Sequence, residues 1–403
     1  MILIISTKGK AVRTYSLAIV TLFSLTGALY AETKSTEDYE MASYCFPLKP
    51  VEQPKVKVQE PETPCSVNLK EPCKKPLIRD VRVDEPKNCF LGYFTISYVQ
   101  PSATNMHYAA EALPLPVPTP NWIIHEIKPC LHVAFDVGVT GVINSAQTFV
   151  NINWRHLCSF DSDTVTVAQA DMVGPFFTIG PDASAYSFAS GKVNHYMQEG
   201  RVNYGTPIKV GDKLSAAVYM GVNYAYLSQT LEFAYSNASS EISRNIYTPS
   251  TFSGAGPQLG TSLAFHIIDS LDLAMGGSLA LLYGCISNST KYESTSPLLA
   301  GLDITPPNTQ TTTPPSTNQM IPSFDGQAGF AFNKVFDCCC SLFVEAGFRA
   351  QLFLGAFQSV DMGSEVPIDS VADSTVGVYA RTFQKNISNF ALAGPYLSIS
   401  LEF

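Results

Sequence analysis

The chain has 403 residues, of which 46% are hydrophobic and only 15% are charged, so it can bury a large apolar surface and wholesale disorder is excluded. Its net charge of −9 provides no basic surface, which argues against nucleic acid as a partner. The 26 Gly, 27 Pro and 19 Tyr, beside only 2 Trp, favour strands and turns over a helical bundle.

Residues 1–31 have the layout of a secretory signal peptide. Basic residues from Lys8 to Arg13 precede an apolar run over 17–29, and small residues follow up to Ala31. The run is short for a membrane span, although a retained anchor is the alternative interpretation. Export makes the ten cysteines of the chain candidates for disulfide bonds rather than for metal binding.

Residues 32–89 predict an extended, weakly ordered periplasmic segment that is rich in Cys and Pro. The segment contains eight prolines and frequent charges, which do not support a packed core. Its four cysteines are Cys45, Cys65, Cys73 and Cys89.

From residue 90 onward, large apolar residues alternate with small or polar ones. Between 271 and 283 the odd positions are almost all large and apolar, whereas Asp272, Gly276 and Ser278 occupy even positions. A helix here would place Asp272 in lipid, at a cost of about 2.5–3.5 kcal/mol for a central Asp. A soluble β-sandwich also alternates, but recurrence of the pattern over most of the chain favours strands with one lipid face and one lumenal face.

We therefore predict an all-β fold over residues 90–403: a transmembrane antiparallel up-and-down β-barrel of about 10 strands, with a range of 8–14. Strands are expected near 90–99, 130–140, 146–157, 190–206, 211–236, 254–267, 271–286, 321–333, 340–356 and 391–403. The stretch 211–236 could hold more than one strand, and the connection 158–189 could hide a pair. Short connections should face the periplasm, and the long polar ones, such as 287–320, should face outward.

The last expected strand ends the chain on an aromatic residue. Leu397, Ile399, Leu401 and Phe403 share one face, after Tyr396 on the other. This resembles the C-terminal signal by which bacterial barrel proteins are recognised for insertion. It implies contact with the barrel assembly machinery and with lipid of the bacterial outer membrane.

Three Gly-rich motifs lie in the expected strands. They are Gly254-Ala-Gly-Pro followed by Leu259-Gly, Gly277-Ser-Leu-Ala-Leu-Leu-Tyr-Gly, and Gly394-Pro-Tyr-Leu leading to the end of the chain. Over about 129–403 these motifs resemble the Legionella-type major outer membrane protein family. The resemblance implies a pore-forming outer-membrane barrel without a cofactor. The Cys/Pro-rich segment and the triplet Cys338, Cys339 and Cys340 depart from that pattern, and are similar in composition to chlamydial envelope proteins that cross-link by disulfides.

The expected topology sorts the cysteines by compartment. Those of the N-terminal segment and the triplet should face the periplasm, where they could link to other envelope proteins or to a second copy of the chain. Cys130 and Cys158 are symmetric about a turn near residue 144, so they should lie opposite each other within disulfide range. Reduced cysteines, or bonds within the chain alone, are the alternative.

Thirteen polar residues are predicted to face the lumen and line a pore: His132, Asp136, Asn151, Asn153, Arg155, Asn223, Gln258, His266, Asp272, Gln327, Glu345, Arg349 and Gln351. Because both charge signs occur, we expect passive diffusion of small hydrophilic solutes with weak selectivity. Small lumenal residues such as Gly276 favour this interpretation. The alternative is a structural or adhesive protein with a filled barrel, in which these groups bond to one another and envelope disulfides add stability.

The sequence predicts neither catalysis nor a metal site. It contains no Gly-x-Ser-x-Gly or His-Glu-x-x-His motif. His125-Glu126 and the acidic group Asp161, Asp163 and Asp171 lie in or near expected outer loops, where carboxylates are usually solvated. One short acidic pair is weak evidence for calcium, and three adjacent cysteines cannot readily all bind one tetrahedral zinc ion.

Overall fold

The computed structural model describes eleven segments of the chain: 90–112, 122–143, 148–167, 173–175, 186–211, 213–237, 243–268, 270–295, 308–337, 340–365 and 379–402. The predicted signal peptide, the Cys/Pro-rich segment, Cys338, Cys339 and Phe403 lie outside them. None of the described residues belongs to a helix long and apolar enough to cross a membrane.

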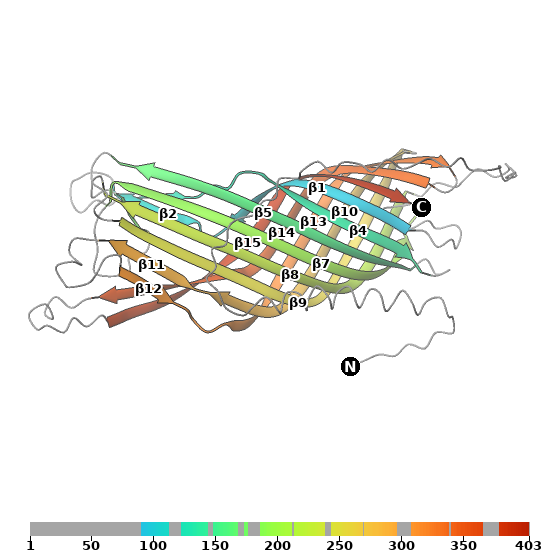
Figure 1. The fold of residues 1–403 in the computed structure, drawn as a ribbon. Coiled ribbons are helices and arrows are strands. Elements are labelled where there is room, and N and C mark those ends of the chain that lie inside the picture. The colour runs from blue at the N-terminus through green and yellow to red at the C-terminus, as the bar shows by residue number, and fades with distance from the viewer. Residues whose placement is uncertain are drawn as a thin grey trace, which may run out of the picture. The chain divides into compact units, whose positions relative to one another are not determined.

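Ten long strands of the described residues form one antiparallel sheet that closes on itself (Figure 1). In chain order they are β1 (Phe90–Ala103), β4 (His132–Val142), β5 (Phe149–Thr166), β7 (Phe188–Lys209), β8 (Leu214–Ser236), β9 (Ser243–Ile268), β10 (Leu271–Asn288), β13 (Thr317–Asp337), β14 (Cys340–Glu365) and β15 (Tyr379–Glu402). Each pairs with the next along the chain, and β15 pairs with β1. The prediction of an up-and-down barrel of about ten strands is confirmed.

Most strands extend further outward than the alternation predicted. β9 begins at Ser243 rather than near 254, and β14 continues to Glu365. The stretch 211–236 holds a single strand. The connection 158–189 holds the short strand β6 (Val173–Pro175), which is not one of the ten barrel strands. Two short strands, β11 (Thr290–Thr295) and β12 (Asn308–Thr312), pair with each other beyond β10 and β13.

The connections differ in length between the two ends of the barrel. At one end they span 143–148, 210–213, 269–270 and 338–339, and β1 begins and β15 ends there as well. At the other end they include 104–131, 289–316 and 366–378. Short turns mark the periplasmic end of such barrels, so β15 descends to the periplasm, as expected.

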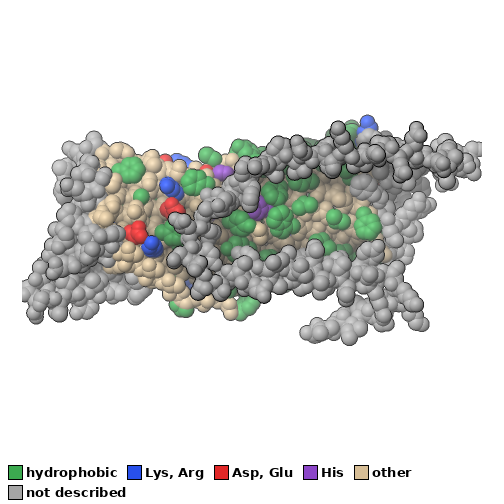
Figure 2. Space-filling model, in the orientation of Figure 1, with side chains coloured by type: hydrophobic (Ala, Val, Ile, Leu, Met, Phe, Trp, Pro, Cys, Tyr) green, Lys and Arg blue, Asp and Glu red, His purple; other side chains and the backbone are tan. Residues whose placement is uncertain are grey.

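The outward face is apolar over the periplasmic half of the barrel. Leu259, Leu279 and Phe348 each expose about half of their surface or more, at 58%, 49% and 55%. Further toward the outer loops the outward positions are polar, as at Lys192 and Asn245. Figure 2 shows the same division, with hydrophobic side chains over one half of this face and charged ones gathered toward the other. The apolar half is the band that contacts lipid.

We predict that Leu279→Lys destabilises the folded barrel, by about 2–4 kcal/mol if the position lies at the bilayer midplane. Leu279 points outward among other apolar side chains, so the charge would lie in lipid. Asn245→Lys is the control, because Asn245 is exposed on the polar part of the same face. Urea unfolding in lipid vesicles measures both, and equal losses would contradict the assignment of the lipid band.

Candidate functional site

The candidate site is the barrel interior, because the predicted polar residues share the inward parity of their strands. All thirteen are buried or half-buried, whereas most of their sequence neighbours on the same strands are more exposed. Whether they line an open passage depends on what else occupies the lumen. From the periplasmic end outward, the lumen contains a polar cavity, a layer of ionised side chains, a cluster of apolar side chains and part of the β1–β4 connection.

A polar cavity of about 120 Å³ lies in the periplasmic part of the lumen. It is lined by amides, hydroxyls and aromatic rings, among them Asn151, Asn153, Asn203, Tyr219 and Gln327. A cavity needs roughly 10–15 Å³ to hold one water, so this space is large enough for several. Closer to the turns, His266 Nδ1 lies 2.6 Å from Asp272 Oδ1, and Tyr396 donates a hydrogen bond to Glu345.

Six ionised side chains form the next group, which we call the charged layer. They are Asp136 on β4, Arg155 on β5, Glu199 and Arg201 on β7, Asp325 on β13 and Arg349 on β14. Three positive and three negative charges cancel. Sequence reasoning missed Glu199, Arg201 and Asp325, although their inward parity follows from the strands at 190–206 and 321–333.

Asp325 is the centre of the charged layer. Its carboxylate accepts hydrogen bonds from Arg349 Nη2 at 2.6 Å, Arg201 Nη1 at 2.6 Å and Arg155 Nη2 at 3.3 Å. β5 and β13 are five strands apart in a ring of ten, so the bond from Arg155 to Asp325 joins opposite walls. The layer therefore crosses the lumen rather than following one wall.

Glu199 completes the charged layer on the other side of the arginines. It accepts hydrogen bonds from Arg201 Nη2 and Asn223 Nδ2, both at 2.7 Å, and from Gln351 Nε2 at 3.0 Å. Arg155 Nη1 lies 3.3 Å from its second oxygen. Buried charges with such partners are tolerated, whereas removing one partner leaves another uncompensated.

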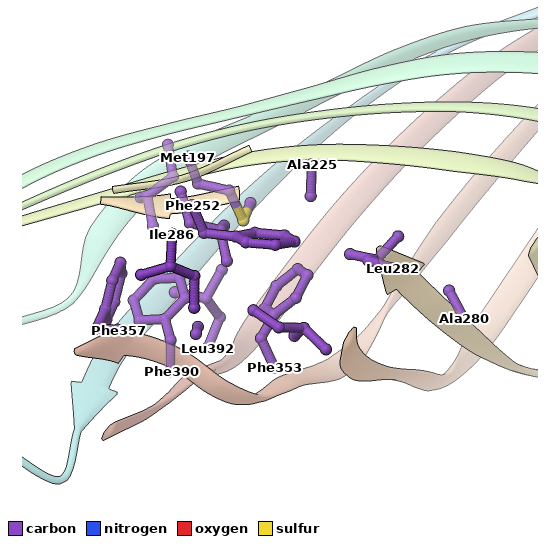
Figure 3. Close-up of a cluster of buried hydrophobic side chains, with 14 of the residues drawn as sticks. Met197, Ala225, Phe252, Ala280, Leu282, Ile286, Phe353, Phe357, Phe390 and Leu392 are labelled. Carbon is purple, nitrogen blue, oxygen red and sulfur yellow. The ribbon is translucent and has the colours of Figure 1, made fainter. Parts of the chain in front are cut away.

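An apolar cluster follows on the outer side of the charged layer (Figure 3). We use that name for the buried set Val99, Ala134, Leu157, Met197, Ala225, Leu227, Phe252, Ala280, Leu282, Ile286, Ile321, Phe353, Ala356, Phe357, Phe390 and Leu392. The ring of Phe390 stacks on Phe353, with centroids 6.3 Å apart, and meets Phe357 edge-on at 5.4 Å. Hydrophobic constrictions of this kind close pores by excluding water.

A β-bulge in β14 lies between two of these aromatic residues. The register against β15 shifts between Phe353 and Phe357, and Gly355 adopts a φ of 71°, which favours glycine. The four residues from Gly355 to Gln358 are consecutively buried, so the alternation is interrupted here. Alternation gives Phe357 the same inward parity as Phe353, but the predicted strand ended at 356, one residue before it.

The outer end of the lumen contains part of the β1–β4 connection, which we call the inserted segment (residues 104–112 and 122–127). Its strands β2 (His107–Ala112) and β3 (Trp122–Glu126) form a separate small sheet with β6. Tyr108 and Ile127 are fully buried against the inward face of Gly191 on β7. The connection lies at the outer end, as expected for a long one, but its apolar residues enter the barrel, which the sequence did not indicate.

Asn105 fixes the inserted segment across the lumen. Its side-chain amide exchanges hydrogen bonds with Gln229 of β8 at 2.8 and 3.1 Å, and its Oδ1 accepts one from Ser388 of β15 at 3.0 Å. β8 and β15 are five strands apart in the ring of ten. The turn at Asn105 therefore spans opposite walls at this level.

Two of the carboxylates expected to be solvated are instead engaged in contacts, Asp161 just beyond the inserted segment and Asp163 with the segment itself. Asp161 is 7% exposed, accepts a hydrogen bond from the Cys130 amide at 2.8 Å and lies 2.8 Å from His132 Nε2. Asp163 accepts a hydrogen bond from the Tyr108 hydroxyl at 3.1 Å. Burial and the Asp163 carboxylate raise the pKa of Tyr108. Asp171 lies outside the described residues.

The predicted strand register, which would place Cys130 opposite Cys158, is wrong. Ala134 pairs with Leu157, so the position level with Cys158 is 133, three residues from Cys130. Three residues of strand span about 10 Å, which is beyond disulfide range. The pairing of β4 with β5 is symmetric about a point between 145 and 146. The prediction placed that point near 144, where it would have made the two cysteines opposite each other. Cys340 begins β14, but its side chain is not described.

The closing strand has the predicted alternation. Leu397, Ile399 and Leu401 point outward with 44–46% of their surface exposed, whereas Tyr396 is 4% exposed and points inward. The residues before Phe403 therefore complete the lipid-facing band where β15 meets β1.

A family model described as Legionella pneumophila major outer membrane protein precursor matches residues 93–403. No curated protein matches the chain by sequence. Among solved structures, the outer membrane protease OmpT from Escherichia coli is similar over 80% of this chain and 99% of its own, with 7% identity and a TM-score of 0.39. The Pseudomonas putida toluene transporter TodX is similar over 79% and 91%, with 6% identity and a TM-score of 0.28.

We predict that Asp325→Asn lowers the free energy of unfolding by about 3–5 kcal/mol, because it leaves three buried arginines with fewer negative partners. Glu293→Gln is the control. Its ion pair with Lys291, at 2.7 Å, is half-exposed and should contribute less than about 1 kcal/mol. Urea unfolding in vesicles measures both, and similar small losses would show that the charged layer is not a stabilising unit.

We predict that Gly191→Val displaces the inserted segment. A Cβ atom at Gly191 would lie 2.7 Å from Tyr108 Cγ and 3.0 Å from Ile127 Cδ1, so the segment must move. Endoproteinase Glu-C added from outside should then cleave faster after Glu126, next to the displaced Ile127, as mass spectrometry can detect. In the control, Gly200→Val on the same strand, the new side chain meets nothing within 4 Å. Equal cleavage in both variants would refute the packing.

Proposed function

Because the chain belongs to the Legionella pneumophila major outer membrane protein family, and so lies in the bacterial outer membrane, we propose that it forms a pore for small hydrophilic solutes, closed in the conformation described here. The observation that carries this proposal is the polar cavity on the periplasmic side of the charged layer. A barrel built only to be filled would not need a hydrated chamber there.

The charges of the lumen favour weak selectivity. The charged layer has three arginines and three carboxylates, so its net charge is zero and neither anions nor cations are excluded by a single-sign field. Solutes would pass between side chains that are already paired. This is the selectivity expected of a diffusion pore rather than of a strict ion channel.

The apolar cluster and the inserted segment supply the closure. Between the charged layer and the outer end, Phe353, Phe357 and Phe390 pack together in the lumen, and Asn105 joins opposite walls further out. Passage therefore requires the inserted segment to withdraw, the aromatic rings to part and the bond from Arg155 to Asp325 to open. Three closures in series imply rare openings rather than a permanently open channel.

The second candidate function is a structural or adhesive barrel. The same apolar cluster favours it, because sixteen buried side chains that meet across the lumen are what a permanently filled barrel needs. Conductance measurements separate the two candidates. We propose no catalytic role, since Asp161 is engaged with Cys130 and His132, and Asp163 with Tyr108 of the inserted segment.

Assembly in the membrane follows from the closing strand. We propose that the barrel assembly machinery recognises the alternation of Leu397, Ile399 and Leu401 up to Phe403, and that lipid then surrounds the same residues. Links of the periplasmic cysteines to envelope proteins or to a second copy of the chain stay a prediction.

We predict that the wild-type protein in planar bilayers shows rare conductance steps and that Phe353→Ala increases the open probability at least several-fold. Phe353 is fully buried in the apolar cluster, so its truncation opens space where water is excluded. Phe348→Ala on the outward face of the same strand is the control. Absence of channels from the folded wild type and from both variants would favour the filled barrel.

A further inference from the structure

The polar cavity beside the charged layer has the composition of a solute-binding site. Side chains from opposite parts of the ring line it, including Tyr93 on β1, Asn151 and Asn153 on β5, Asn203 on β7, Tyr219 on β8 and Gln327 on β13. Pockets that bind small molecules combine apolar surface with a few fixed polar groups. Here the apolar surface is aromatic and the polar groups are mostly amides.

Several of these amides have hydrogen-bonding capacity that the protein does not use. Asn203 is 7% exposed, and its Oδ1 has no hydrogen-bond partner among the described residues. The side chains of Asn153 and Gln327 likewise make no hydrogen bond within the described part of the chain. Buried polar groups are normally satisfied, so Asn203 Oδ1 needs a bound solute or water, and the half-buried Asn153 and Gln327 face the same cavity with free bonding capacity.

The charged side chains of the cavity are, in contrast, already engaged. Arg349 donates from Nε, Nη1 and Nη2 to Asp325 and Asp136, and Arg201 donates from both terminal nitrogens. These two arginines and two aspartates line the cavity, and their charges cancel. An ion gains no net attraction there, and a zwitterion would have to break an existing ion pair.

We propose that this cavity binds uncharged polyhydroxylated solutes, the sugar and polyol class. A hydroxyl group both donates and accepts, which matches amides that present an NH₂ group and a carbonyl oxygen side by side. The rings of Tyr219 and Phe149 supply flat apolar surface for the C–H faces of such a solute. The inference rests on the proposed function in placing the site on a solute path, but binding itself needs no open pore.

The test is equilibrium binding to the full chain, folded in detergent micelles, by calorimetry or saturation-transfer NMR. The probes are glucose, its anionic relative gluconate and its cationic relative glucosamine. We expect glucose to bind at least fivefold more tightly than either charged probe. Asn203→Ala should weaken glucose binding roughly three- to tenfold, the loss of one or two hydrogen bonds. Asn194→Ala, on the outward parity of the same strand, is the matched control and should bind as the wild type does.

Equal or tighter binding of gluconate or glucosamine would overturn the proposal, as would unchanged glucose affinity in Asn203→Ala. If that variant does not fold, Asn153→Ala gives the same test from β5. Swelling of proteoliposomes in glucose separates this site from the pore. Glucose entry without measurable binding overturns the site and leaves the pore, whereas binding without entry supports the site and counts against the pore.

Discussion

The structure depends on one constraint: within lipid, every backbone N–H and C=O group must find its partner inside the protein. The chain meets this constraint by pairing each strand with the next and then β15 with β1, so that no edge is left among the ten strands. Ring closure fixes which way each side chain points. One parity contacts lipid and must be apolar, and the other enters a lumen that ten strands keep narrow.

A narrow lumen brings opposite walls within reach of side chains. Arg155 and Asp325 meet across the ring, as do Gln229 and Ser388 through Asn105. Polar and apolar contacts alternate along the barrel axis, with the charged layer followed by the apolar cluster and then by the inserted segment. Each layer uses a different interaction, so the barrel is stiffened at several levels while hydrated space is kept at the periplasmic end.

The sequence was sufficient to predict the ten strands and their order, because lipid requires an apolar residue at every second position. It could not show the outer ends of the strands, where Lys192 and Asn245 face water and the alternation weakens. Contacts across the lumen were equally hidden, since Arg155 and Asp325 are 170 residues apart. The bulge at Gly355 interrupts the alternation, so the burial of Ala356 and Gln358 could not be predicted either.

The pairing of β1 with β15 also has a consequence for the order of folding. Leu91 lies opposite Glu402, so the seam joins residues that are 311 positions apart and forms after almost the whole chain has crossed the inner membrane. Entropy opposes such a distant closure, and topologies dominated by distant pairings fold slowly. Until the seam closes, the edges of β1 and β15 would both accept another strand. The period between export and closure is therefore when this chain is most exposed to aggregation, and when help from other proteins would matter most.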